Sequence, residues 1–223
     1  MLTSVLVFTK TTGYRHASIP DGVAAVRALG EAHRFAVTAT EDAGAFTPAS
    51  LAAHQAVIWL STSGDVLDPV QRAAFRSYVD AGGGFVGVHA AATSEVSWPW
   101  YGGLVGARFA RHPDVQPAAI HVEDAATDAT AHLPARWEHT DEWYDFDANP
   151  RPDVRVLMTV DESTYTGGTM GTDHPITWCH PYAGGRSWYT ALCHTPESFS
   201  DPRIRRMLLG GIRYAAGTDP LHR

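Results

Sequence analysis

The chain has 223 residues, of which 44% are hydrophobic and 18% charged, values typical of an ordinary globular protein. Its formal net charge of −7 disfavours nucleic acids and anionic membranes as partners, because both bind clustered Lys and Arg. No apolar run approaches the roughly 18 residues of a membrane span, and the first residues lack the basic region of a signal peptide. Two cysteines make no disulfide framework, so we expect a cytoplasmic location.

The first half of the chain alternates strand-like and helix-like segments. Apolar, β-branched runs predict four strands, at residues 4–10, 35–40, 55–60 and 85–88. One helix is predicted to begin near Ser18, with Asp21 as the capping-box partner of Ser18. Two more are predicted to begin after Thr47 and after Asp68, each of which precedes a proline. This alternation predicts an α/β fold with a doubly wound, mostly parallel sheet and helices on both faces.

The second half is less regular. Four further strands are predicted, at residues 116–122, 154–161, 176–179 and 188–193. The last two flank a glycine-rich turn, and we expect them to form a hairpin near the far edge of the sheet. A final helix begins at Asp201 and ends at Gly217. No repeat or linker divides the chain, so a single domain over residues 1–223 is predicted.

The segment from Gly83 to Ala91 is the most informative one. It reads as a buried strand that ends at His89, with small residues on both sides. Small neighbours suit a tight turn that holds one side chain at the carboxyl edge of a sheet, as the nucleophile elbow does. Here that side chain is an imidazole, so the function depends on what a histidine can do at this position.

Several polar side chains follow the predicted strands at the same edge. His16 follows the first strand, Thr62 the third, His89 the fourth, and His194 the last. Ligands of open parallel sheets bind outside the carboxyl ends of the strands, so these residues are expected to converge. Structural roles are the alternative, because Thr62 would equally cap a helix and His16 would bond within its own loop.

Two more stretches carry candidate site residues. Residues 141–146 alternate acidic and aromatic side chains, among them Glu142 and Tyr144, and such a pattern can line a sugar-binding cleft. Residues 171–180 contain Asp173 and His174, whose spacing matches no known metal motif. No glycine-rich loop precedes a helix, so no nicotinamide or flavin site is visible.

Five segments follow one another in a characteristic order: residues 10–16, 83–91, 141–144, 170–178 and 189–197. Together they resemble the trehalose-utilisation ThuA-like family. It implies a flavodoxin-like fold of the class I glutamine amidotransferase-like type. It also implies a role in bacterial carbohydrate catabolism, linked to keto-sugars.

The same resemblance argues against glutaminase activity. Class I amidotransferases use an elbow Cys together with a His-Pro-Glu sequence after a late strand, whereas this chain has His89 at the elbow and His194-Thr195-Pro196-Glu197 later. Imidazole cannot replace a thiolate in forming a glutamyl thioester. Cys193 is predicted to lie on a strand with its thiol on the other face, which makes it a poor substitute nucleophile.

The first functional hypothesis is an isomerase, lyase or hydrolase acting on a sugar or keto-sugar. His89, His194 and Glu142 would be its acid/base groups, with a helix N-terminus after the elbow or a divalent metal such as zinc stabilising an oxyanion. The metal ligands would be His89, His174 and His194. We expect six residues to bind the substrate: His16, Thr62, Trp100, Tyr144, Asp173 and His174.

The second hypothesis is a non-catalytic sugar-binding or regulatory module that kept the scaffold and lost the nucleophile. In both hypotheses the partner is a small carbohydrate. Several histidines aimed at one edge favour the enzyme. A homodimer is the expected assembly from the frequency of dimers among enzymes.

Overall fold

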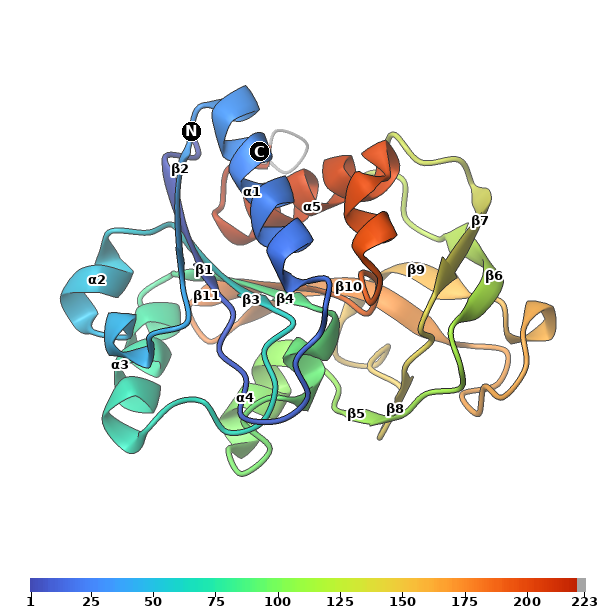
Figure 1. Ribbon diagram of the computed structural model, residues 1–223, viewed down its shortest axis with the longest axis horizontal. Coiled ribbons are helices and arrows are strands. Elements are labelled where there is room, and N and C mark those ends of the chain that lie inside the picture. Colours follow the sequence, from blue (N-terminus) through green and yellow to red (C-terminus); the bar gives the residue numbers. More distant parts are fainter. Residues whose placement is uncertain (220–223) are drawn as a thin grey trace.

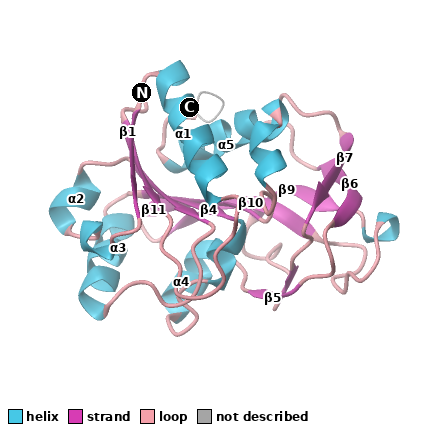
Figure 2. Ribbon diagram, viewed as in Figure 1, coloured by secondary structure: helices cyan, strands magenta, loops and turns pink. Residues whose placement is uncertain are grey.

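A computed structural model describes residues 1–219 (Figures 1 and 2). Its helices are α1 (Ile19–His33), α2 (Pro48–Ala52), α3 (Pro69–Asp80), α4 (Pro99–Val105) and α5 (Pro202–Ala215). Its strands are β1 (Ser4–Phe8), β2 (Ala36–Thr40), β3 (Ala56–Leu60), β4 (Gly84–Val88), β5 (Phe109–Arg111), β6 (Gln116–Val122), β7 (Arg136–Asp141), β8 (Asp145–Phe146), β9 (Arg155–Val160), β10 (Pro175–Tyr182) and β11 (Gly185–Thr190).

Nine of these strands form one sheet, in the order β2-β1-β3-β4-β11-β10-β9-β6-β7. The strands from β2 to β11 run parallel, and their order is that of a flavodoxin-like doubly wound sheet. The strands from β10 to β7 extend it with antiparallel pairs. Helices α1 and α5 cover one face and α3 and α4 the other (Figure 1), so the predicted α/β fold is confirmed.

The position of the β10–β11 hairpin differs from the prediction. Both strands lie in the middle of the sheet, because β11 pairs with β4 and β10 with β9. Both strands are buried along nearly their whole length. Such burial is expected of strands in the middle of a sheet and not of edge strands. The sheet then continues outward through β9 and β6 to β7, a strand that was not predicted from the sequence.

Helix α1 begins differently from the prediction. Ser18 makes no side-chain cap, so the capping box with Asp21 is wrong. The Ser18 hydroxyl instead donates a hydrogen bond to the carbonyl of Cys193, 3.2 Å away. Asp68 does cap α3, with Gln71 completing the box as its side chain returns to the Asp68 N–H.

Aromatic side chains fill the core between the parallel strands and α3 and α4. Trp59 is fully buried and packs against Phe8 and Phe75, each with its ring centroid 5.4 Å away. Burial of each such side chain stabilises the folded state by roughly 1.5–3 kcal/mol. Tyr101 extends this cluster and donates a hydrogen bond to the Ala91 carbonyl at 3.0 Å, so the core directly supports the turn after β4.

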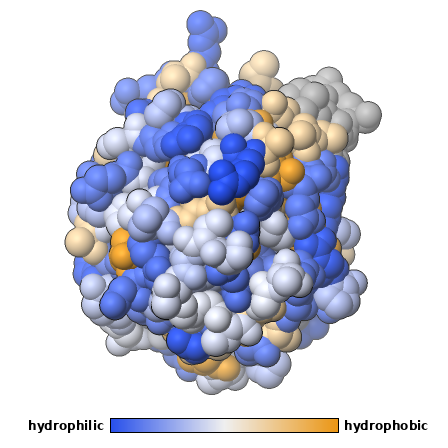
Figure 3. All heavy atoms as spheres, turned by 90° about the vertical axis from the view of Figure 1, so that its right-hand side faces the viewer, coloured by the Kyte–Doolittle hydropathy of each residue, from blue (hydrophilic) through white to orange (hydrophobic). Residues whose placement is uncertain are grey.

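The face at the antiparallel end of the sheet, on the right of Figure 1, is mostly hydrophilic (Figure 3). Hydrophobic residues form only small, separate patches on the side drawn there, so it offers no broad apolar surface for a partner. Within residues 1–219, no helix combines the length and the apolar composition that crossing a membrane requires.

Candidate functional site

His89 directly follows β4, in a backbone conformation that few residues adopt. Its φ is +49°, in the left-handed region, and its side chain is fully buried. The Tyr189 hydroxyl donates to the His89 carbonyl at 2.9 Å, which helps to hold the turn. The sharp turn predicted from the small neighbours of His89 is therefore present. The helix predicted after the elbow is present as a short 3₁₀ helix, His89–Thr93.

The hydrogen bonds of His89 define its tautomer. Nδ1 lies 2.6 Å from the Ala191 carbonyl, which can only accept, so Nδ1 carries the proton. In the neutral ring Nε2 then keeps its lone pair, and the Tyr144 hydroxyl donates to it at 3.0 Å. An imidazole anchored to a main-chain carbonyl in this way presents its second nitrogen as a metal ligand or a base.

His194 reaches the same point from the loop after β11. Its Nδ1 lies 3.1 Å from Nε2 of His89 and 3.2 Å from Oε2 of Glu142. The hydrogen bond with Glu142 raises the pKa of His194, and burial opposes this rise. His194 is thus held by contacts from two distant segments.

The Asp141 carboxylate fixes the loop that carries His194. It accepts the N–H groups of Cys193 at 2.7 Å and His194 at 2.9 Å. Burial acts to raise the pKa of Asp141, but hydrogen bonds from His139 and the main chain outweigh it and lower that pKa. Asp141 belongs to the acidic and aromatic stretch identified in the sequence, yet no spacing rule marks it as a support for His194.

Cys193 lies in this loop, so its predicted place on a strand is wrong. Strand β11 ends at Thr190, and Cys193 has a φ of +86°. Its thiol is nevertheless fully buried, and burial raises its pKa well above the usual value. A thiol in this state is a poor nucleophile.

Glu142 connects the cluster to the rim of the cavity. Its Oε2 lies 3.4 Å from Nε2 of His89, and its Oε1 lies 3.0 Å from Nδ1 of His112. Burial acts to raise the pKa of Glu142, but the hydrogen bond with His194 and the adjacent His89 imidazole lower it far below its usual range. His112 was not singled out in the sequence, because it follows a short strand with no motif around it.

His16 packs edge-on against the other two imidazoles. Its ring centroid lies 4.7 Å from that of His89 and 5.1 Å from that of His194. Burial, with the nearby His89 and His194, lowers the pKa of His16 to about 3, so its ring is neutral at physiological pH. Its Nδ1 is buried without a hydrogen-bond partner among the described residues.

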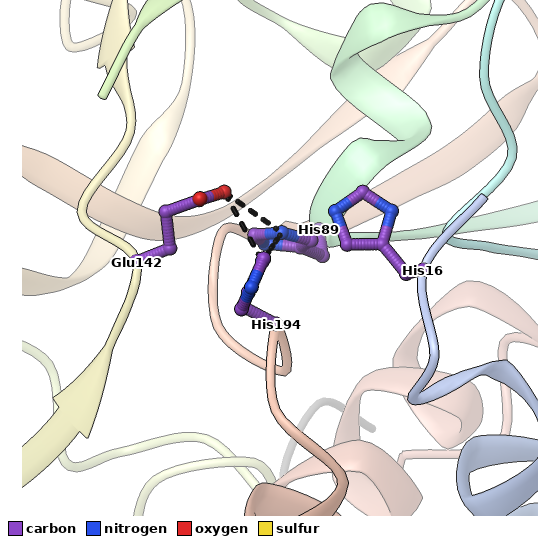
Figure 4. A group of neighbouring side chains, drawn as sticks. All are labelled: His16, His89, Glu142 and His194. Carbon is purple, nitrogen blue, oxygen red and sulfur yellow. Dashed lines mark hydrogen bonds and ion pairs between the residues drawn. The ribbon is translucent and has the colours of Figure 1, made fainter. Parts of the chain in front are cut away.

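His16, His89, Glu142 and His194 together form one compact group of donors (Figure 4). Each contributes one atom, and these four atoms all lie within 4.8 Å of one another. The side chains come from four separate segments of the chain and point toward a common centre. Three nitrogens and one carboxylate oxygen are donors that suit zinc.

A cavity of about 590 Å³ opens beside this group. His16, Glu142 and His194 line it, together with Tyr144 and the loops that follow β1 and β3. Those two strands are neighbours at which the strand order of the sheet reverses, which is where ligands of doubly wound sheets bind. The volume lies within the range of about 300–1,000 Å³ that is common for small-molecule sites.

Four of the six predicted substrate residues lie outside the lining of the cavity: Thr62, Trp100, Asp173 and His174. Thr62 is fully buried, and its hydroxyl accepts a hydrogen bond from Ser94 at 2.8 Å. Trp100 stacks on Trp98 at 4.7 Å, outside the lining of the cavity. Asp173 pairs with Arg151, whose Nε lies 2.8 Å from its carboxylate.

His174 is separate from the other predicted metal ligands. It belongs to a second group, with Asp145 and Glu162, and its Nδ1 lies 2.8 Å from Glu162 Oε1. Its Nε2 donates to the Tyr144 carbonyl at 2.8 Å. His174 therefore contacts the main chain behind Tyr144, and the trio of His89, His174 and His194 does not gather around one point.

Comparisons with known proteins agree with the fold. A ThuA-like protein from Bacteroides uniformis is 24% identical, with a TM-score of 0.81 over 98% of this chain and 93% of its own. A ThuA-like protein from Parabacteroides merdae is 20% identical, with a TM-score of 0.82 over 98% and 91%. A β-galactosidase from Bacillus circulans sp. alkalophilus is 13% identical, with a TM-score of 0.61 over 98% of this chain and 32% of its own.

These likenesses to solved structures, all under 25% identity, show a shared fold. No curated protein is similar enough in sequence to match. The family model named ThuA and described as trehalose utilisation matches residues 4–215. Since this match spans nearly the whole sequence, the chain belongs to the ThuA family, which is associated with carbohydrate metabolism.

Proposed function

We propose that the protein is an enzyme acting on a sugar or keto-sugar, with a divalent metal such as zinc held by His89, His194 and Glu142. One observation carries this proposal. The three donor atoms form a triangle with sides of 3.1, 3.2 and 3.4 Å. Three ligands at zinc bond lengths of about 2.0–2.1 Å in a tetrahedral arrangement lie roughly 3.3 Å apart.

The surroundings of the triangle support the same proposal. The bond from His89 Nδ1 to the Ala191 carbonyl is the kind of outer contact that orients ligating histidines. The Asp141 contacts hold the main chain at His194 in a similar way. His16 stands beside the triangle as a candidate fourth ligand. Substrate would then bind as a fifth ligand, a coordination number that catalytic zinc sites reach in the transition state.

The bound metal would supply electrophilic polarisation of a sugar carbonyl or hydroxyl. The protein's own groups would place the substrate against it. His112, with a side chain 41% exposed, stands on the wall of the cavity, where its ring can hydrogen-bond to a sugar hydroxyl. The reaction would be an isomerisation, elimination or hydrolysis of a carbohydrate. The family description supports the substrate class, and the buried thiol of Cys193 argues against a thioester mechanism.

A non-catalytic sugar-binding module is the second candidate. One observation favours it: Nε2 of His89 already has two hydrogen-bonding neighbours within the protein, Nδ1 of His194 and the Tyr144 hydroxyl. In that case the cavity would bind a carbohydrate on a metal-free polar floor. A small carbohydrate is the proposed partner in both cases, and the proposed location is the cytoplasm. The homodimer stays a prediction.

The deciding experiment is elemental analysis of protein purified without a histidine tag. We expect about one divalent metal per chain, lost in His89→Ala and retained in His121→Ala, a matched control at a partly exposed histidine beside Asp161. Incubation with keto-sugars, followed by NMR, then tests turnover in the same three proteins. Absence of metal from the unmodified protein, even after incubation with zinc, would contradict the metal site and favour the binding module.

A further inference from the structure

Tyr14 is the most exposed aromatic side chain at the cavity. It is 70% exposed, although it lies in the loop directly after β1 and lines the same cavity as His16 and Glu142. Its ring packs edge-on against that of His16, with 4.8 Å between the ring centroids. The ring of Tyr14 is therefore accessible to solvent while it contacts His16, a member of the histidine cluster.

The main chain that carries Tyr14 is fixed, although its side chain is not packed. The Ser63 hydroxyl donates to the Tyr14 carbonyl at 2.7 Å, and the Thr12 N–H donates to the Ser63 carbonyl at 2.8 Å. Gly64 has a φ of +73°, and a Cβ there would lie 2.3 Å from the Thr12 hydroxyl. The two loops are thus locked together, so the main chain at Tyr14 needs no ordering when a ligand binds, and only the side chain loses rotamer freedom.

Other side chains that line the cavity are aromatic as well. Phe109, which is partly exposed, packs on Tyr144 with 4.4 Å between ring centroids, and His112 stacks on Tyr144 at 6.0 Å. Phe109, Tyr144 and His112 all line the cavity. The site therefore combines a cluster of histidines with aromatic side chains from separate segments of the chain.

We propose that Tyr14 is the stacking platform for a second ring of the substrate, so that the site takes a disaccharide or other glycoside rather than a free monosaccharide. This rests on the proposed function. One sugar ring would lie on the floor of histidines, and the next would place its apolar C–H face on the ring of Tyr14. An exposed tyrosine suits this role because it combines an apolar face with a polar hydroxyl and loses few rotamers on binding.

The test measures sugar affinity by calorimetry on metal-loaded protein. The probes are trehalose and maltose as disaccharides and glucose as the monosaccharide. Tyr14→Ala is expected to weaken disaccharide binding roughly tenfold while glucose binding stays unchanged. Tyr14→Phe should keep the affinity, because the face of the ring is retained. Val96→Ala, at a residue 67% exposed, is the control for loss of an exposed apolar side chain.

The outcomes separate this proposal from the metal site. Equal affinities of Tyr14→Ala and the unmodified protein for the disaccharides would overturn the platform, and so would an equal loss for glucose. Failure of the unmodified protein to bind any disaccharide at the highest soluble concentration would also overturn it. The metal content of each variant is measured in parallel. If the proteins hold a full complement of metal but Tyr14→Ala has no effect on disaccharide binding, the metal site stands and the platform does not. If the protein binds disaccharides through Tyr14 but holds no metal, the platform stands and the metalloenzyme is contradicted. The melting temperature of Tyr14→Ala should stay near that of the unmodified protein, since the ring is exposed.

Discussion

The carboxylate of Asp141 accepts the main-chain N–H of His194 at 2.9 Å, so a fully buried charge on β7 sets the position of an imidazole that follows β11. The two residues lie 53 positions apart in the sequence. A second carboxylate oxygen takes the Cys193 N–H, and the Ser18 hydroxyl holds the Cys193 carbonyl. The His194 loop is therefore held through its main chain from two sides.

Asp141→Asn tests this support. An amide in the same place offers one acceptor oxygen instead of two, so one of the two N–H groups loses its partner. We expect a loss of stability of about 1.5–3 kcal/mol, measured by urea unfolding. Metal affinity should fall roughly 10–100-fold, since the change acts on a group that positions a ligand. Unchanged metal affinity would show that the loop stays in place without this charge.

Substitutions at His89 separate its backbone role from its imidazole role. Asn tolerates the left-handed region, whereas Val is strongly disfavoured there. Both His89→Asn and His89→Val should lose the metal. His89→Val should also be the less stable by about 1–3 kcal/mol in urea unfolding, because its φ must move away from +49°. Equal stability of the two variants would mean that the turn relaxes freely.

Tyr144→Phe removes the hydroxyl that donates to Nε2 of His89. A metal would take the lone pair that this hydroxyl occupies, so its removal should favour the metal by about 0.5–1.5 kcal/mol. We expect a few-fold gain in zinc affinity, measured by competition with a chelating dye. A clear loss of affinity would instead identify the Tyr144 oxygen as a ligand.

Asp128 should give the protein a pH-dependent stability away from the site. It bonds to Arg206 at 2.5 Å and Arg213 at 3.0 Å on α5, and these contacts lower its pKa against the effect of burial. A carboxyl whose pKa is lower in the folded state stabilises the protein above its unfolded pKa of about 3.9, and this contribution is lost as the pH falls through the folded pKa. Asp128→Asn should cost about 2 kcal/mol at pH 7. The difference from the unmodified protein should shrink on acidification, which urea unfolding at several pH values measures.

The convergence of His16, His89 and His194 was predictable because parallel strands bring their carboxyl ends to one edge. The sequence pattern located each strand end to within a few residues. The residues that complete the site were not predictable in this way. Glu142 was identified from its acidic and aromatic surroundings, but its approach to His89 depends on the course of the outer strands.

The misplaced residues have physical reasons. Thr62 follows β3 as expected, but its side chain turns inward to Ser94, because local turns decide which way a residue after a strand points. Trp100 lies on α4. This helix has only seven residues, too few to show a recognisable helical pattern in the sequence. The β10–β11 hairpin lies in the middle of the sheet because β11 pairs with β4. The residues of the hairpin themselves do not indicate this pairing, since β4 is distant in the sequence.

The four donors of the cluster come from positions 16, 89, 142 and 194, so an ion there would tie together segments that span most of the chain. Glu142 follows the outermost strand of the antiparallel half, whereas His16 and His89 follow strands of the parallel half. Binding an ion would therefore act as a cross-link between the two halves of the sheet, and it would resist unfolding in proportion to the logarithm of the free metal concentration. Resistance to heat and to proteolysis would then report on metal supply, which makes the abundance of the protein itself sensitive to that supply.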